Sequence, residues 1–81
     1  MERDGNAFIF VDPKEFASFL HVQRMLEGCV QKDLAMAILV VQSVISDWEK
    51  GNTEPMLSNA MIWANALGYR LALVPFENPE V

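Results

Sequence analysis

The sequence predicts a compact, mainly α-helical domain of four to five short helices, with a small antiparallel pair of strands formed by its two ends. Three observations lead to this fold class. Apolar residues recur at helical spacing through the middle of the chain, and Gly and Pro separate the periodic stretches. Short runs of β-branched and aromatic residues lie near both termini. At 81 residues, 52% of them apolar, the chain can bury one small core, so we expect a single domain over residues 1–81.

The first predicted strand covers residues 7–11, where Ala7 is followed by Phe, Ile, Phe and Val. Aromatic and β-branched side chains favour a strand over a helical turn. A strand needs a partner, and the other candidate is the alternating segment at residues 69–74, which Pro75 ends. We therefore expect these two segments to pair, with an exposed edge available to a second copy of the chain.

The first helix is predicted to follow Asp12, whose side chain can accept from free amides, while Pro13 suits the first helical position. It should end at Gly28, which can adopt the left-handed conformation. A last helix is predicted from about Met56 to Leu67, with Gly68 as its stop. We expect Trp63 of this helix to be partly exposed. Its inward residues are predicted to be Leu57, Met61, Ala64 and Leu67.

The centre of the chain predicts two short helices. Leu34 and Ile38 lie four residues apart on one helix face, and Ile45 and Trp48 lie three apart on another, after a break between the two pairs. Isolated helices under about 12 residues are marginal in water, so each must pack on the other and on a neighbouring element. Residues 31–50 are therefore predicted to form a helix-turn-helix motif.

A longer set of residues matches a known pattern in register and without a gap. Its members are Arg24, Gly28, Gln31, Leu34, Ala35, Ile38, Ile45, Ser46, Trp48, Glu49, Gly51, Pro55 and Ala66–Tyr69. With this spacing, roughly residues 19–74 resemble the Xre family of lambda-repressor-like helix-turn-helix domains. In that family the first helix of the motif crosses the DNA backbone and the second lies in the major groove. The resemblance implies a sequence-specific transcriptional regulator, repressor-like or antitoxin-like, that binds double-stranded operator DNA as a homodimer through a recognition helix at about residues 42–50.

The resemblance also implies roles for individual polar residues. Gln31 matches a glutamine that holds both the DNA backbone and the first base-reading side chain. Gln31 could equally be a solvated glutamine at a helix start. The polar face of the second helix, made of Gln, Ser and Asp, is likewise what an ordinary solvated helix presents, so the sequence allows both interpretations. Six further positions face DNA in the family, the first four toward bases and the last two toward phosphates: Gln42, Ser43, Ser46, Asp47, Lys50 and Asn52.

Two more features of the resemblance concern the scaffold. Arg24 and Glu49 match a structural ion pair of the family that braces the motif, and such an arginine can also reach a phosphate. The turn departs from the family pattern, because Leu39 stands where glycine is usual and Val41 where a Ser or Thr cap is usual. A leucine with positive φ costs energy and valine offers no cap, so we expect a distorted turn.

The charge of the chain favours a second interpretation. The net charge is −5, and residues 31–55 hold two lysines against four acidic residues, a balance of −2. Phosphate binding requires a lysine and arginine surface. The alternative function is a helix-turn-helix scaffold that binds a protein partner, such as a toxin or another regulator, with weak or no DNA binding. A positive stripe through Arg24, Lys32 and Lys50 would favour DNA.

Catalytic and metal-binding functions lack the residues that they need. His21 and Cys29 are each the one residue of their type. They make no nucleophile–base pair or metal set, so we expect a buried structural thiol, no metal, no cofactor and no enzymatic activity. The sequence has no signal-peptide pattern and no apolar run near the ~20 residues of a membrane span. We expect a cytoplasmic protein without membrane contact.

Overall fold

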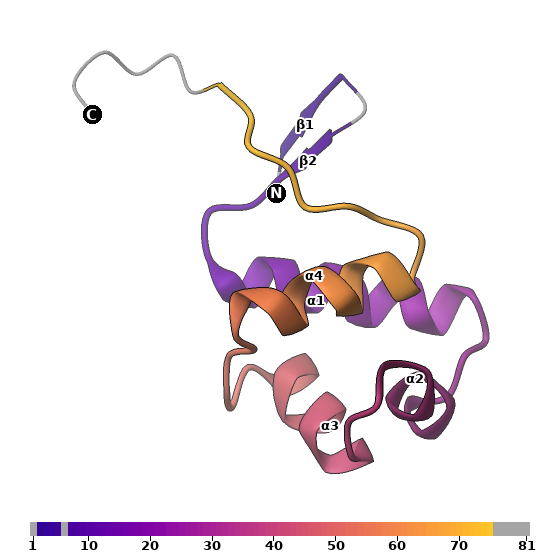
Figure 1. Ribbon diagram of the computed structural model, residues 1–81. Helices are drawn as coiled ribbons and strands as arrows, with labels where there is room; N and C mark the ends of the chain where they lie inside the picture. Colours follow the sequence, from indigo (N-terminus) through magenta and orange to yellow (C-terminus); the bar gives the residue numbers. More distant parts are fainter. Residues whose placement is uncertain (1, 6, 76–81) are drawn as a thin grey trace.

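The computed structural model describes residues 2–5 and 7–75, which form a hairpin followed by four helices (Figure 1). In Figure 1, α2 and α3 lie on one side of α1 and α4, while the hairpin and the C-terminal segment lie on the other. The predicted mainly α fold is confirmed. None of the helices in the described ranges is long and apolar enough to cross a membrane. The elements are β1 (Glu2–Asp4), β2 (Ala7–Ile9), α1 (Pro13–Leu26), α2 (Gln31–Ile38), α3 (Gln42–Lys50) and α4 (Leu57–Ala66).

The strand pair differs from the predicted one. β1 pairs antiparallel with β2, with Glu2 opposite Ile9, and residues 69–74 form no strand. The prediction that the two ends of the chain pair is therefore wrong. A hairpin turn at Gly5, where φ is 59°, joins neighbouring segments, and such local pairing costs less loop-closure entropy than pairing across the whole chain.

The C-terminal segment nevertheless lies beside β2. Residues 7–10 and residues 68–74 line the same groove. The rings of Phe8 and Tyr69 are 6.3 Å apart and nearly perpendicular. Side-chain packing, without a ladder of backbone hydrogen bonds, therefore joins the two ends of the described chain.

The first helix has the predicted capping residues. The Asp12 carboxylate accepts from the Glu15 amide at 2.9 Å, and Pro13 occupies the first turn. At the other end Gly28 has φ of 70°, the left-handed conformation that glycine adopts without steric cost. These local signals fix where α1 begins and ends.

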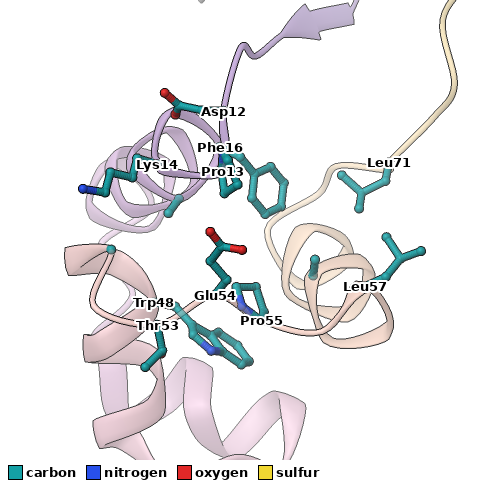
Figure 2. A pocket seen from close by; sticks show the side chains of 13 residues that line it. Asp12, Pro13, Lys14, Phe16, Trp48, Thr53, Glu54, Pro55, Leu57 and Leu71 are labelled. Atoms are coloured by element: carbon teal, nitrogen blue, oxygen red, sulfur yellow. The ribbon is translucent and has the colours of Figure 1, made fainter.

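The loop after α3 approaches the start of α1 and leaves a pocket of about 420 Å³ beside the first turn of α4. Figure 2 shows the side chains of Phe16, Trp48 and Leu57 around this pocket. Most of the residues that line it are apolar. The pocket lies at the C-terminal end of α3, whereas the predicted base-reading Gln42 begins that helix.

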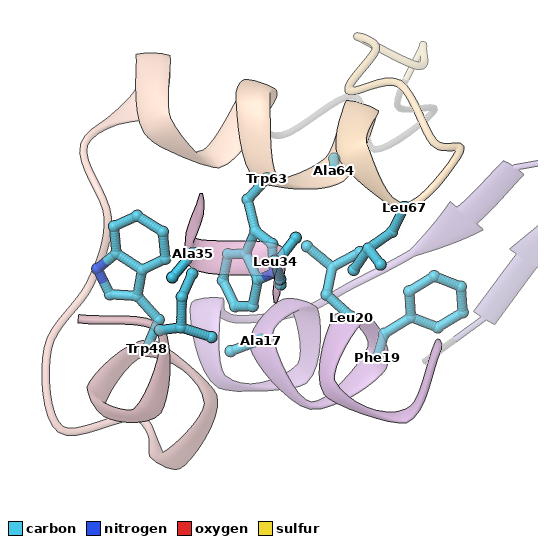
Figure 3. Close-up of a cluster of buried hydrophobic side chains, with 10 residues drawn as sticks. Ala17, Phe19, Leu20, Leu34, Ala35, Trp48, Trp63, Ala64 and Leu67 are labelled. Atoms are coloured by element: carbon cyan, nitrogen blue, oxygen red, sulfur yellow. The ribbon is translucent and has the colours of Figure 1, made fainter. Parts of the chain in front are cut away.

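The core lies among the four helices (Figure 3). Its largest fully buried side chains are Leu20 of α1, Ile45 of α3 and Trp63 of α4. The Trp63 ring packs on Trp48 with centroids 5.3 Å apart, and on Phe16 at 5.7 Å in an edge-to-face arrangement. The indole of Trp63 thus connects α4 to both α1 and α3.

α4 buries a different face from the predicted one. Trp63 is fully buried, whereas Leu57 and Met61 are exposed, so the predicted orientation is wrong for these three residues. Ala64 and Leu67 are buried as predicted. Because α4 is apolar on nearly every side, residue spacing does not identify its inner face. Burying the large indole of Trp63 contributes more to stability than burying the smaller side chains of Leu57 and Met61 would.

The turn between α2 and α3 contains one strained residue. Leu39 has φ of 62° and ψ of 42°, the left-handed conformation, and the residue is 91% exposed. This conformation costs a residue with a Cβ roughly 1–2 kcal/mol. Val41 has an extended backbone and gives α3 no side-chain cap. α3 still begins at Gln42 as predicted, so Leu39 and Val41 do not shift the start of the helix. Their effect is limited to local backbone strain at Leu39 and a missing side-chain cap at Val41.

Candidate nucleic-acid interface

A buried carboxylate on α3 organises the polar residues of the motif. The Glu49 side chain is 3% exposed, and Arg24 of α1 donates to both of its oxygens. The distance from Arg24 Nε to Glu49 Oε2 is 2.6 Å, and that from Nη2 to Oε1 is 3.0 Å. Arg24 Nη1 also donates to the Cys29 carbonyl at 2.7 Å. The guanidinium therefore connects α1, the segment before α2 and the end of α3.

His21 joins the same carboxylate, although its sequence context gave no metal or catalytic partner. Its Nδ1 lies 2.7 Å from Glu49 Oε1. An ionised carboxylate can only accept, so Nδ1 is the nitrogen that carries the proton in this contact. His21 precedes Arg24 by three residues on α1, which is the spacing of one helix face. That spacing is the signal in the sequence that could have placed the two side chains together.

The surroundings of Glu49 keep it ionised. Burial by itself would raise the pKa of the Glu49 carboxyl, but hydrogen bonds from Arg24, Gln31 and His21 together outweigh it and hold that pKa below its ordinary value. The hydrogen bond to Glu49 raises the pKa of Arg24 in return. The pair is therefore charged at neutral pH, with each charge balanced by the other.

The carboxylate also fixes the orientation of Gln31 at the start of α2. Gln31 Nε2 donates to Glu49 Oε1 at 2.9 Å, which turns the amide oxygen of Gln31 away from the buried pair. Gln42 Nε2, at the start of α3, donates to that oxygen at 3.4 Å. The amide of Gln42 is thus connected to the buried ion pair through one intermediate side chain.

The other predicted contact residues lie along α3 and just beyond it. Ser43 and Lys50 are exposed, whereas Ser46 and Asp47 are half-buried. Asn52 follows the helix, and its Nδ2 donates to the Asp47 carboxylate at 3.5 Å. The Asn52 amide also donates to the Asp47 carbonyl at 2.9 Å. The structure thus brings Gln31 together with Gln42, and Asp47 together with Asn52.

The structure does not present the full positive stripe that would favour DNA. Arg24 is buried and occupied by Glu49, so the stripe of three basic residues is reduced to the exposed Lys32 and Lys50. The negative charge of Glu49 is likewise compensated inside the protein. Among the described residues, no group of three or more His, Cys, Asp or Glu side chains could hold a metal ion. Besides amide and hydroxyl groups, the two motif helices therefore expose Lys32, Asp33 and Lys50, and Asp47 is half-buried.

A comparison with known families identifies this arrangement. A family model described as helix-turn-helix matches residues 20–74, which is most of the chain. The chain belongs to the Xre, lambda-repressor-like helix-turn-helix family. This family consists of DNA-binding regulatory domains and is not a family of enzymes. No curated protein matches the chain.

Membership of the helix-turn-helix family agrees with the geometry of the two central helices. α2 and α3 are the helices of the motif, and the residues that join them to α1 are Arg24, His21 and Glu49. Of these, His21 is the residue that sequence reasoning missed. Cys29, expected to be a buried structural thiol, is half-buried, and its carbonyl accepts from Arg24.

Proposed function

We propose that this protein is a sequence-specific DNA-binding transcriptional regulator, repressor-like or antitoxin-like, which places α3 in the major groove of operator DNA. The observation that carries the proposal is the chain of hydrogen bonds from Glu49 through Gln31 to Gln42. It holds an exposed amide in one orientation at the start of the recognition helix. A preorganised amide is what bidentate recognition of a base requires.

The chemistry of base recognition follows from the orientation of Gln42. One Nε2 hydrogen is directed to Gln31, which leaves the second hydrogen and the amide oxygen for a base edge. These two groups match N7 and the N6 amino group of adenine. Ser43, Ser46 and Asp47 would contribute the remaining base contacts, in which serine is permissive and aspartate accepts from cytosine.

Backbone contacts would come from residues at the helix ends. Val30 and Val41 precede α2 and α3 and provide no side-chain cap, so the first amides of both helices are available to a phosphate. In this proposal Gln31 donates to a phosphate at the start of α2, and Lys50 and Asn52 contact phosphates beyond the end of α3. The missing cap at Val41 thus suits an anion at the helix start.

We propose further that the regulator binds as a homodimer to a pseudo-palindromic operator, with one α3 helix in each half-site. α4 contains no charged residue, and Met61 and Ile62 are exposed on it. Because the chain carries a net charge of −5, two copies repel each other least across an uncharged surface. The outer face of α4 is therefore the proposed contact between protomers.

A binding selection tests this function. The purified protein would be incubated with duplexes that carry about 24 randomised base pairs, which is long enough for two half-sites one helical turn apart. We expect one pseudo-palindromic sequence to be enriched, two chains to bind each duplex, and Gln42→Ala to lose discrimination at one base pair per half-site. Gln23→Ala is the matched control, because Gln23 lies on α1 and accepts from Tyr69. Failure to enrich any sequence at low salt would rule out the DNA-binding proposal.

A specific observation favours a second candidate function. Leu39 and Val41, at the turn between α2 and α3, and Met36, in the last turn of α2, are exposed apolar residues. An apolar cluster on an acidic protein suits a protein partner, such as a toxin or another regulator, better than it suits phosphates. If the selection enriches nothing, Leu39→Asp should abolish capture of such a partner, whereas Gln42→Ala should not.

A further inference from the structure

We infer that His21 is a positioning residue for base recognition, which acts on Gln42 through Glu49 and Gln31 without touching DNA itself. The inference rests on the proposed DNA-binding function. His21 lies on α1, outside the two helices of the motif, and none of the roles described above assigns it a part in recognition. Three successive hydrogen bonds join it to Gln42: His21 to Glu49, Glu49 to Gln31, and Gln31 to Gln42.

Three donors converge on one oxygen atom of Glu49. Glu49 Oε1 accepts from His21 Nδ1 at 2.7 Å, from Gln31 Nε2 at 2.9 Å and from Arg24 Nη2 at 3.0 Å. A carboxylate oxygen has about two lone pairs, so three donors compete for it. The contact to His21 is the shortest of the three. The imidazole is therefore one of the groups that determine where Oε1 lies.

The position of Glu49 Oε1 influences the orientation of the Gln31 side chain. The side-chain amide of Gln31 donates to the same Oε1. A rotation of the carboxylate would change the direction of this bond and, with it, the position of the Gln31 amide oxygen. Gln42 donates to that amide oxygen at 3.4 Å, a long bond that a small displacement would break. Removing His21 is therefore expected to release Gln42 from its fixed orientation.

Glu49 does not depend on His21 for its balancing charge. Arg24 alone supplies Glu49 with its balancing charge and with hydrogen bonds to both oxygens. The His21 side chain is 38% exposed, so water can replace its hydrogen bond at little cost in folding free energy. The loss of His21 should thus be felt in the geometry of recognition more than in the free energy of unfolding.

A double-mutant cycle between His21 and Gln42 tests the inference. The variants are His21→Ala, Gln42→Ala and the combination, each measured by fluorescence anisotropy on the enriched operator and on the same duplex with the Gln42-dependent base pair changed. We expect His21→Ala to weaken operator binding about two- to tenfold, the effect of one hydrogen bond. In the Gln42→Ala background the same substitution should change the affinity by much less. A residue with only a structural role would give equal losses in both backgrounds.

Two further variants make the outcome decisive. His21→Gln keeps a side-chain donor for Glu49 and should restore most of the affinity and discrimination, even if His21→Ala proves unstable. Met25→Ala is the matched control on an exposed position of α1 and should bind as wild type does. Equal losses in both backgrounds, or a His21→Gln variant that binds as poorly as His21→Ala, would overturn the inference while leaving DNA binding intact. If the wild-type protein enriched no duplex, the proposed DNA-binding function itself would be ruled out.

Discussion

Glu49 is the residue on which the geometry of the motif most depends. It is an acceptor only, so every group around its carboxylate must be a donor, and this requirement fixes the orientations of Arg24, His21 and Gln31 at once. A neutral amide in its place would accept on one side and donate on the other. The balanced charge of the pair with Arg24 also removes one negative charge from the field near the proposed DNA surface.

The stability that Glu49 supplies should depend on pH with a definite sign. The pKa of Glu49 is lowered in the fold, so its contribution is complete above the pKa of an unfolded glutamate, about 4.3, and is lost as pH falls through the lower folded pKa. We expect Glu49→Gln to lower the urea midpoint at pH 7, and the difference from wild type to shrink below about pH 4. Urea unfolding at several pH values measures this difference. Glu54→Gln, at an exposed position, is the control. A difference that stays constant with pH would show that the charge of Glu49 contributes nothing.

At the scale of elements, the sequence predicted what local signals determine. The apolar spacing of residues 31–50 and the capping residues around α1 gave helix positions that the structure confirms. The partner of β2 was not predictable in this way, because residues 69–74 have a suitable alternation but β1 lies closer along the chain. The residue spacing did not show which face of α4 is buried, because the helix is apolar on nearly every side.

The candidate site was predictable to a similar extent. The resemblance to the family predicted that Arg24 and Glu49 form an ion pair, and their side chains are in contact. The contact of His21 with Glu49 spans 28 residues and depends on the packing of α1 against α3, which no local pattern encodes. Long-range polar contacts of this kind require the assembled fold.

The strained turn between α2 and α3 offers a test at this scale. Glycine adopts the left-handed conformation of Leu39 without a steric penalty, so Leu39→Gly should raise the free energy of unfolding by about 1 kcal/mol. Urea unfolding at neutral pH measures the change. Met36→Gly is the matched control, because Met36 is also exposed but lies within α2, where glycine should cost about 1 kcal/mol. A loss of stability in both variants would mean that the Leu39 side chain makes contacts that outweigh its strain.

At the scale of the whole molecule, an acidic chain has to bind DNA with few phosphate contacts. The net charge is −5, and the buried pair of Arg24 and Glu49 leaves Lys32 and Lys50 as the exposed basic residues of the two motif helices. Few counterions would then be released on binding, so non-specific affinity should be weak. Discrimination between sequences would rest on oriented neutral groups such as the amide of Gln42.

This balance predicts a shallow dependence of operator affinity on salt. Each phosphate neutralised contributes about −0.9 to the slope of log K against log salt concentration, so Lys50→Ala should make the slope less negative by about one per protomer. Arg70→Ala is the matched control, because it removes the same charge from the C-terminal segment, which lies across α1 and α4 from the motif in Figure 1. Anisotropy titrations on the enriched duplex across a range of salt concentrations give both slopes. If Arg70→Ala changed the slope as much as Lys50→Ala does, the positive charge would be acting through the whole-molecule field, and Lys50 would have no phosphate contact of its own.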